Sequence, residues 1–340
     1  MFKRRKFIRN LVCVLLVTIV ILSLTGCNKI YETTSPIVPI TAKIVALKGP
    51  TGIGMVRVMN EIISLSDYVN TDFEIMTSTD TVVAGLMDGS IDIAAVPTNI
   101  ASVLYNKTEG QIQLLVVHTL SVLYILDKSG NVNDFSDLKG KTIVTSGRGS
   151  LPQYVLEFLL TENGIDPVTD VTIVYMSEHS EVATMLLAGE ADVVMLPEPF
   201  VSTVMNKDET IKLAIDLNDA WTQAAPDITL SMGCLVAQKS FIEENPEEVA
   251  TFLDLYKESI DWVLAEPYNA KDLIVSSGIM DNAEVAEKAI PNCNIVFITA
   301  ADAKESLNAF FEFLYSQNPA SVGGKVPDDG LYYVEAENND

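Results

Sequence analysis

Two glycine-rich turns carry the residue types best suited to holding a small ligand. They read Lys48-Gly49-Pro50-Thr51-Gly52 and, 100 residues further on, Gly147-Arg148-Gly149-Ser150. Each follows an expected strand and opens an expected helix, where free N–H groups and the helix dipole favour an anion or a polar atom. Glycine also lets a ligand approach the backbone closely, although these glycines could serve only to turn the chain. Lys48 and Arg148 would place one cation on each side of such a site, unless both are solvated surface residues.

A second pair of expected helix starts carries polar side chains at the same spacing, Thr98-Asn99 and Glu198-Pro199. Asn99 could orient a ligand or simply cap its helix. A carboxylate at Glu198 would favour a ligand that is rich in hydrogen-bond donors, such as an aminopyrimidine. Both helix starts are therefore candidate binding positions.

Histidine and aromatic residues supply the remaining candidates. His118 and Thr119 follow an expected strand, and we expect them at the edge of the ligand site, with His179 in the matching loop of the second half. Each histidine could instead be structural. Tyr154 and Trp221 could stack on a planar solute, and core packing is the alternative for each.

The sequence gives little support for catalysis or metal binding. It contains no GxSxG, HExxH or P-loop motif. His118 and His179 lie in different halves and lack the spacing of metal ligands, so no metal and no cofactor is predicted. Cys234 and Cys293 have no CxxC partner or neighbouring histidine, and we expect two buried thiols, with a disulfide between them left open.

The elements that must position these residues form a repeat. Residues 85–99, GLMDGSIDIAAVPTN, recur at an offset of 100 as residues 185–199, MLLAGEADVVMLPEP. Each copy reads as a helix end, a glycine C-cap, a short buried strand and a proline-led helix start. One unit used twice at this spacing predicts two similar α/β lobes.

The apolar periodicity fills in the two lobes. Residues 42–127 and 141–215 each alternate strands and helices, which implies parallel sheets with short crossovers. Residues 241–315 read as helical almost throughout, and we expect the acidic tail from Asp328 to fray. We predict lobe one as 42–127 plus 237–325 and lobe two as 128–236. The chain must cross twice between them, so two hinge strands and an intervening ligand crevice are expected.

The first residues form a targeting segment. Five basic residues precede an apolar run from Leu11 to Leu24 that is short for a membrane span and typical of a signal peptide. Residues 24–27, Leu-Thr-Gly-Cys, resemble the lipobox of bacterial lipoproteins, in which the cysteine is acylated. We therefore expect a signal peptide at 1–27, lipidation at Cys27 and a flexible tether at 28–41, which would anchor the protein to the outer face of the membrane.

Composition describes a globular, strongly acidic chain. Of 340 residues, 48% are apolar, and the formal charge is −24. Removing residues 1–27 takes five of the 22 basic residues and no acid, which leaves 17 basic against 46 acidic residues and a charge near −29. Such a surface repels nucleic acid and anionic lipid, so neither is expected as a partner.

Several motifs, taken in order, resemble one known family. They are DLKGK at 137–141, the paired G-x-x-D units at 89–92 and 189–192, EPF at 198–200 and FIEENPE at 241–247. This order, together with a lipobox, is similar to the nitrate, sulfonate, taurine and thiamine-precursor branch of periplasmic substrate-binding proteins. The similarity covers roughly Lys43 to Tyr315. The turn at 48–52 replaces a more aromatic segment of the thiamine-precursor members, which leaves the ligand open.

The resemblance implies a fold and a function. The fold is the two-lobe periplasmic-binding-protein fold (type II), in which two α/β lobes joined by two hinge strands close on a solute. The function is that of a monomeric solute-binding lipoprotein that delivers its ligand to the permease of an ABC importer. A biosynthetic enzyme on the same scaffold, for pyrimidine or menaquinone-type precursors, and a solute-sensing receptor subunit are the alternatives. The solute is either a sulfonate-like monoanion or a neutral heterocycle such as a pyrimidine; the scarcity of well-placed cations favours the heterocycle.

Overall fold

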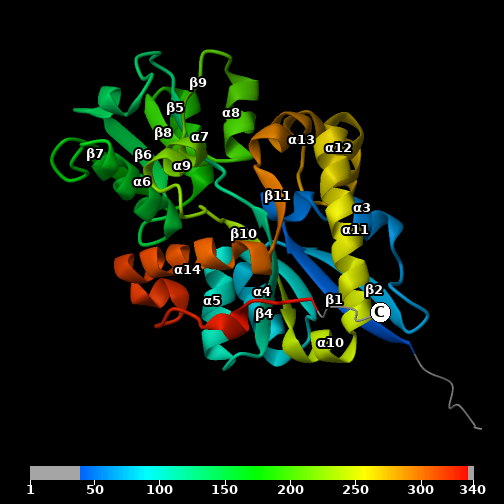
Figure 1. Cartoon of the computed structure of the whole chain (residues 1–340). Coiled ribbons are helices and arrows are strands. Elements are labelled where there is room, and N and C mark those ends of the chain that lie inside the picture. The colour runs from blue at the N-terminus through cyan, green and yellow to red at the C-terminus, as the bar shows by residue number, and fades with distance from the viewer. Residues whose placement is uncertain (1–38, 336–340) are drawn as a thin grey trace, which may run out of the picture. The chain divides into compact units, whose positions relative to one another are not determined.

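The computed structural model describes residues 39–335, whose strands form two mixed sheets. The first sheet has the order β11-β4-β10-β3-β1-β2 and the second the order β7-β6-β8-β5-β9. The strands are β1 (Ile40–Leu47), β2 (Val69–Met76), β3 (Ile93–Pro97), β4 (Ile112–Thr119), β5 (Leu123–Asp127), β6 (Thr142–Ser146), β7 (Thr172–Met176), β8 (Val193–Pro197), β9 (Lys212–Asp216), β10 (Gly233–Gln238) and β11 (Ile295–Thr299). We call the first sheet with its helices lobe one and the second lobe two (Figure 1).

Helices cover both faces of each sheet. The earlier ones are α2 (Pro50–Ile53), α3 (Val56–Glu61), α4 (Thr79–Asp88), α5 (Thr98–Lys107), η1 (Phe135–Leu138), α6 (Leu151–Glu162), α7 (His179–Ala188), α8 (Phe200–Lys207) and α9 (Leu217–Ala224). The later ones are α10 (Lys239–Glu244), α11 (Pro246–Ala265), α12 (Pro267–Ser276), α13 (Ala283–Ala289), η2 (Ile290–Asn292), α14 (Ala300–Gln317), η3 (Pro319–Val322) and η4 (Asp329–Leu331). The predicted two-lobe α/β fold is confirmed.

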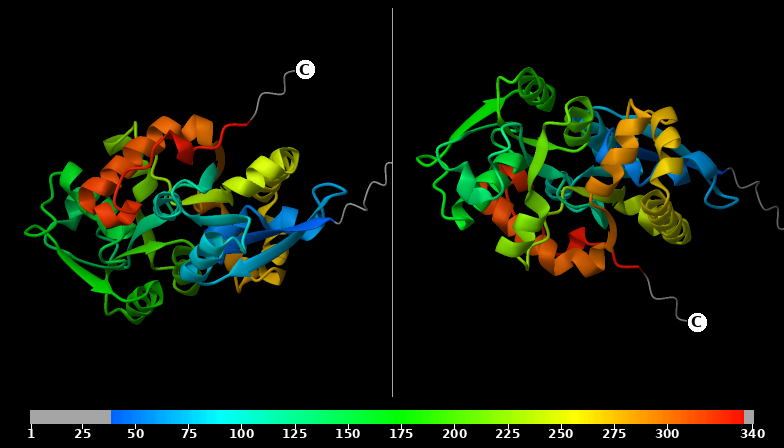
Figure 2. Two further views of the ribbon diagram at one scale, coloured as in Figure 1. Left: turned by 90° about the horizontal axis from the view of Figure 1, so that it is seen from below. Right: turned by 90° about the horizontal axis from the view of Figure 1, so that it is seen from above.

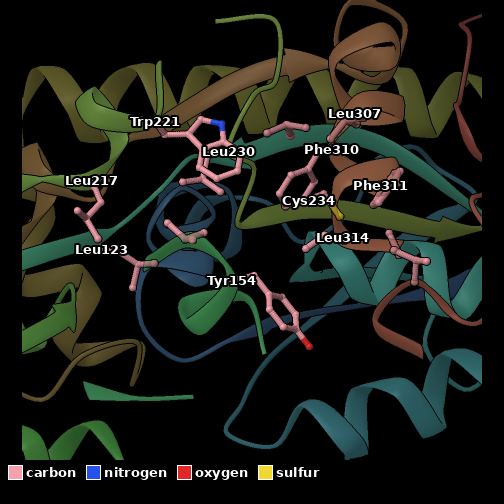
Figure 3. Close-up of a cluster of buried hydrophobic side chains, with 14 of the residues drawn as sticks. Leu123, Tyr154, Leu217, Trp221, Leu230, Cys234, Leu307, Phe310, Phe311 and Leu314 are labelled. Carbon is pink, nitrogen blue, oxygen red and sulfur yellow. The ribbon is translucent and has the colours of Figure 1, made fainter. Parts of the chain in front are cut away.

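Successive side chains along each strand point to opposite faces of the sheet, which divides the core into separate clusters. In β1, Val45 joins the cluster beneath α4, α5 and α14, whereas Ile44 and Ala46 join the cluster beneath α3 and α11. Lobe two shows the same alternation between a face covered by α6 and α9 and one covered by α7 and α8. The first of these clusters runs through both lobes, because α14 contributes buried side chains beside residues of α9 (Figure 3).

The two crossing strands are antiparallel to their neighbours, which corrects the prediction of purely parallel sheets. Strand β5 is antiparallel to β8 and β9, and β10 is antiparallel to β3 and β4. The carboxyl ends of β3 and β8 lie at cavities between the two sheets: Pro97 lines one cavity, and Pro199, two residues after β8, lines another. Strands β5 and β10 each come directly from the other lobe and enter their sheet at this end. They therefore run antiparallel to β8 and β3, respectively.

The predicted lobe boundaries also shift. Strand β5 at 123–127 lies in the second sheet, and β10, which begins at Gly233, lies in the first. The crossings are therefore residues 120–122 and 225–232, and the division of the chain into lobes remains our proposal. Residues 40 and 41, predicted as part of the tether, already belong to β1.

The repeated unit has the predicted form. Helix α4 ends at Gly89 with φ 78°, and α7 ends at Gly189 with φ 73°, both in the left-handed conformation that glycine adopts freely. A buried strand and a proline follow in each lobe.

Two predictions for the last third of the chain are wrong. Residues 295–299 form β11, an edge strand antiparallel to β4, inside the stretch predicted as helical. The segment from Asp328 to Glu335 does not fray as a whole: Leu331 and Tyr332 are buried, and Tyr332 forms a bridge with Leu114. Residues 1–38, which include the predicted signal peptide, Cys27 and most of the predicted tether, lie outside the described residues.

Candidate crevice between the lobes

Two cavities lie between lobe one and lobe two, and we name each by one lining residue. The Phe200 cavity has a volume of about 560 Å³. It is lined by Lys48, Gly49, Thr77, Pro199, Phe200, Thr203, Asn206, Lys207, Ile279, Met280, Asp281, Asn282 and Val285. The Tyr154 cavity has a volume of about 470 Å³. It is lined by Pro97, Asn99, Gly149, Ser150, Leu151, Pro152, Tyr154, Met232, Leu314, Asn318, Ala320 and Ser321.

The Phe200 cavity receives the ends of β1 and β2 from lobe one and the start of α8 from lobe two. Gly49 has φ 95° and donates its N–H to the carbonyl of Ile279. The Lys48 ammonium lies 2.7 Å from the Asp281 carboxylate, so its charge is paired at the cavity rim. Phe200, Ile279 and Met280 supply apolar surface to the lining, and Thr203 and Asn206 supply polar groups.

The Tyr154 cavity receives the end of β3 and the start of α6. The Tyr154 hydroxyl donates to the carbonyl of Gly149 over 2.8 Å and accepts from the Asn318 amide over 3.3 Å. Figure 3 shows this hydroxyl pointing away from the apolar cluster. The Asn99 amide donates to the carbonyl of Ser321. Of the predicted site residues, Asn99, Gly149, Ser150 and Tyr154 line this cavity, and Lys48 and Gly49 line the other.

Most of the glycine-rich turn expected to bind a ligand in lobe one packs against its own chain and does not reach either cavity. Pro50, Thr51 and Gly52 belong to α2, a helix of four residues, and line neither cavity. Gly52 is buried, and an added Cβ would lie 2.8 Å from the carbonyl oxygen of Leu47. This glycine is therefore needed for packing against its own strand.

His118 is a core residue, which corrects the expectation that it reaches the edge of the crevice. It is 1% exposed, and its ring meets Tyr256 edge-on with centroids 6.3 Å apart. Its Nδ1 lies 2.8 Å from the Thr119 hydroxyl. Burial lowers the pKa of His118 to about 4, because the charged imidazole loses its hydration. Thr119 is also buried.

The side chains of Thr98 and Glu198 form hydrogen bonds with other residues of the protein. The Thr98 hydroxyl lies 2.7 Å from the Ser231 hydroxyl, and both are buried. The Glu198 carboxylate accepts hydrogen bonds from the backbone N–H and hydroxyl of Ser202, and from the amide of Asn292 across the lobes. Burial raises the pKa of Glu198 to about 7, and the bonds from Ser202 partly oppose this rise.

His179 follows β7 and lies beside the crevice wall. Its Nδ1 is 2.5 Å from the Ser146 hydroxyl, and its ring lies against Phe200 with centroids 5.6 Å apart. Burial lowers the pKa of His179. Ser146 is only 2% exposed, so its hydroxyl orients the histidine and is not presented as a nucleophile. The position of His179 in the repeat matches Thr79 after β2, and not His118 as predicted.

Arg148 and Trp221 follow the alternatives that the sequence left open, a surface cation and a core residue. The exposed Arg148 guanidinium lies over the Tyr175 ring, 5.3 Å from its centroid, and lines neither cavity. Trp221 is 1% exposed and donates its indole N–H to the carbonyl of Ile228. It therefore packs in the core and offers no face to a solute.

Several cavity residues were not singled out from the sequence. Phe200 lies in the motif EPF, which indicates the family resemblance but does not mark a ligand contact. Met280 and Asn318 come from distant segments, and no local pattern marks them.

Cys234 and Cys293 are buried free thiols, as expected. In residues 39–335, three or more potential metal ligands of the His, Cys, Asp or Glu type gather nowhere, and no helix is long and apolar enough to cross a membrane.

Residues 110–270 match the family model described as "NMT1/THI5 like". Over 140 residues the chain is 25% identical to a Bacillus subtilis (strain 168) protein named "Putative binding protein YtlA". That match covers 41% of this chain and 39% of the relative, so it spans well under two thirds of the relative's length.

Solved structures share the fold across most of the chain. An ABC transporter structure from Parabacteroides distasonis gives a TM-score of 0.74 at 24% identity, covering 87% of this chain and 99% of that one. The periplasmic aliphatic sulphonate binding protein SsuA of Escherichia coli gives 0.70 at 14% identity, covering 88% and 94%. The predicted resemblance is thereby confirmed: residues 110–270 are similar to the NMT1/THI5-like family, and the chain has the periplasmic-binding-protein fold.

Proposed function

We propose that this protein is the extracytoplasmic solute-binding lipoprotein of an ABC importer. One observation carries the proposal: the carboxyl ends of β1, β3, β6 and β8, each leading into a helix or turn, meet across a crevice crossed by two segments. Open α/β sheets bind ligands at such ends, and two lobes joined in this way can close on a small molecule. The family match and the shared fold support this role.

The partners of the proposed receptor follow from its place in transport. They are a small solute, the permease of the importer and the membrane, which the protein would meet through acyl chains on Cys27. We propose a monomer on the outer face of the cell membrane. The lipobox at residues 24–27 supports the anchor, and the acidic composition argues against nucleic acid as a partner. The SsuA structures are named for sulfonate binding, which makes sulfonates one class to test here.

The full chain, extracted from membranes in detergent, should be analysed by native mass spectrometry. We expect one small solute per protein, which is released on unfolding and can be identified by its mass. If none is bound, a thermal-shift screen with sulfonates and pyrimidines follows. Absence of both a bound solute and any thermal response would contradict solute binding.

The same spectra test the anchor. The mature mass should show loss of residues 1–26 and added acyl chains. A Cys27→Ala variant should lack these chains and leave the membrane fraction. Retention of the intact N-terminus in wild type would contradict lipidation and leave the binding role to be decided by the solute.

A further inference from the structure

The two flanks of the crevice are held together by different kinds of contact. On the first, the aromatic flank, Phe158 of α6 and Trp221 of α9 enclose Phe313 of α14. The ring centroids are 4.8 Å apart for Phe158 and Trp221, 5.4 Å for Phe158 and Phe313, and 5.1 Å for Trp221 and Phe313. Helix α14 also packs on β4 and β11 of lobe one, so a continuous apolar core joins the lobes here (Figure 3). Figure 2 shows the orange ribbon of α14 beside the green ribbons of lobe two.

The second, or polar, flank joins α8 of lobe two to α13 of lobe one. The Lys288 ammonium donates to the Asn206 amide oxygen across the lobes, and it also lies 3.0 Å from the Glu284 carboxylate of its own helix. The side chains of Lys288 and Glu284 are 52% and 65% exposed. Water can replace these contacts when the helices separate.

This contrast decides which flank can open. Separating the aromatic flank would expose the buried Trp221 and two further aromatic rings to water, which costs a large hydrophobic free energy. Separating the polar flank would exchange the exposed contacts of Lys288, and the partly buried bond between Asn292 and Glu198, for contacts with water. This should cost less than exposing three aromatic rings. Relative motion of the lobes should therefore pivot about the aromatic flank and widen the polar one.

We infer that the solute enters between α8 and α13 and binds in the Phe200 cavity, while the Tyr154 cavity keeps its shape near the pivot. The Phe200 cavity lies on the opening side, since α8 supplies Phe200, Thr203 and Asn206 to its lining and the segment before α13 supplies Met280. The Tyr154 cavity is bounded by α6 and the end of α14, both of which join the aromatic flank. This inference rests on the proposed function.

The lining of the Phe200 cavity defines the class of solute. Phe200, Ile279 and Met280 offer an apolar surface, and Thr203 and Asn206 offer hydrogen-bonding groups. The Lys48 charge is already paired with Asp281 at 2.7 Å. Lys207 is a second cation in this lining. The cavity therefore suits a compact amphipathic solute with an apolar or aromatic face and a polar edge that is neutral or carries a single negative charge.

Spin labels on the full chain in detergent test the pivot without a ligand. Four exposed glutamates provide the sites: Glu209→Cys with Glu284→Cys spans the polar flank, and Glu162→Cys with Glu312→Cys spans the aromatic flank. Double electron–electron resonance should give a clearly broader distance distribution for the polar pair. Equal widths, or a broader distribution for the aromatic pair, would overturn the inference. Cys234 and Cys293 are buried and should remain unlabelled.

Two matched substitutions test the binding cavity with the solute identified in wild type. Phe200 and Leu151 are half-buried apolar residues at the first position of α8 and α6. Phe200→Ala should weaken solute binding about tenfold by calorimetry, whereas Leu151→Ala should change it by less than about threefold. The reverse order would overturn the assignment of the cavity. A wild type that binds no solute would contradict the proposed function, and the spin labels would still decide the pivot.

Discussion

Lobe one and lobe two contain the same α–β–α unit but use the residues at its ends differently. The unit α4–β3–α5 of lobe one matches α7–β8–α8 of lobe two, with a left-handed glycine and a buried strand in each. In lobe one Thr98 continues directly into α5 and bonds Ser231. In lobe two Glu198 bonds Ser202, and α8 begins two residues later at Phe200. The backbone unit is therefore a scaffold, and the side chains after each strand set the properties of each lobe.

The two histidines show the largest expected difference between the lobes. His118→Ala should lower the free energy of unfolding by about 3 kcal/mol, because it leaves a cavity beside Tyr256 in a closed core. His179→Ala should cost less than about 1 kcal/mol, because the site is half-buried and solvent can enter. Urea unfolding of the two variants measures the difference. Equal losses would mean that His118 is not packed as described.

Buried titratable groups give the lobes opposite pH dependences. The pKa of Glu198 is raised from 4.5 to about 7, so its contribution to stability is complete below about pH 4.5 and is lost as pH rises to about 7. The pKa of His118 is lowered from 6.5 to about 4, so its contribution is complete above about pH 6.5 and is lost as pH falls towards 4. The two effects oppose each other over the shared range.

Glu198→Gln should therefore raise stability relative to wild type with increasing pH, by up to about 3 kcal/mol near pH 7.5. His118→Asn should change the slope the other way: its deficit relative to wild type should shrink as pH falls from 6.5 to 4. Urea unfolding at half-unit pH intervals measures both differences. A Glu198→Gln difference that is constant across pH would show that this carboxyl does not titrate in the folded protein near neutrality.

The predictability of the molecule follows the same division between scaffold and side chains. The repeated unit was predictable because its apolar period, glycine cap and proline are local signals. Strand β11 was missed because helical stretches flank it on both sides, although its sequence IVFIT is rich in the β-branched and aromatic residues that favour strands. His118 was misplaced because both faces of β4 are buried, so alternation could not show that its ring meets α11. Phe200 and Met280 come together only through tertiary folding.

The glycine caps test whether the scaffold itself is equivalent in the two lobes. Gly89→Ala and Gly189→Ala should each lower the free energy of unfolding by about 1 kcal/mol, the cost of a left-handed alanine. An added Cβ meets no atom within 4 Å at either position, so the backbone term should stand alone. The corresponding asparagine variants should cost less. Unequal alanine losses, measured by urea unfolding, would show that packing differs at these two caps.

Lys48 and Arg148, which occupy matching positions 100 residues apart, should give the smallest effects on stability. Lys48 pairs with Asp281, whose side chain is 86% exposed, whereas Arg148 lies over the Tyr175 ring. A double-mutant cycle of Lys48→Ala with Asp281→Ala should give a coupling free energy below about 1 kcal/mol that vanishes near 1 M salt, because solvent and ions screen the pair. The cycle of Arg148→Ala with Tyr175→Leu should give a coupling of about 0.5 kcal/mol, as expected for an exposed cation–π contact. A Lys48–Asp281 coupling that persists in high salt would indicate a pair shielded from solvent. The rim of the Phe200 cavity would then be more closed than the exposure of Asp281 implies.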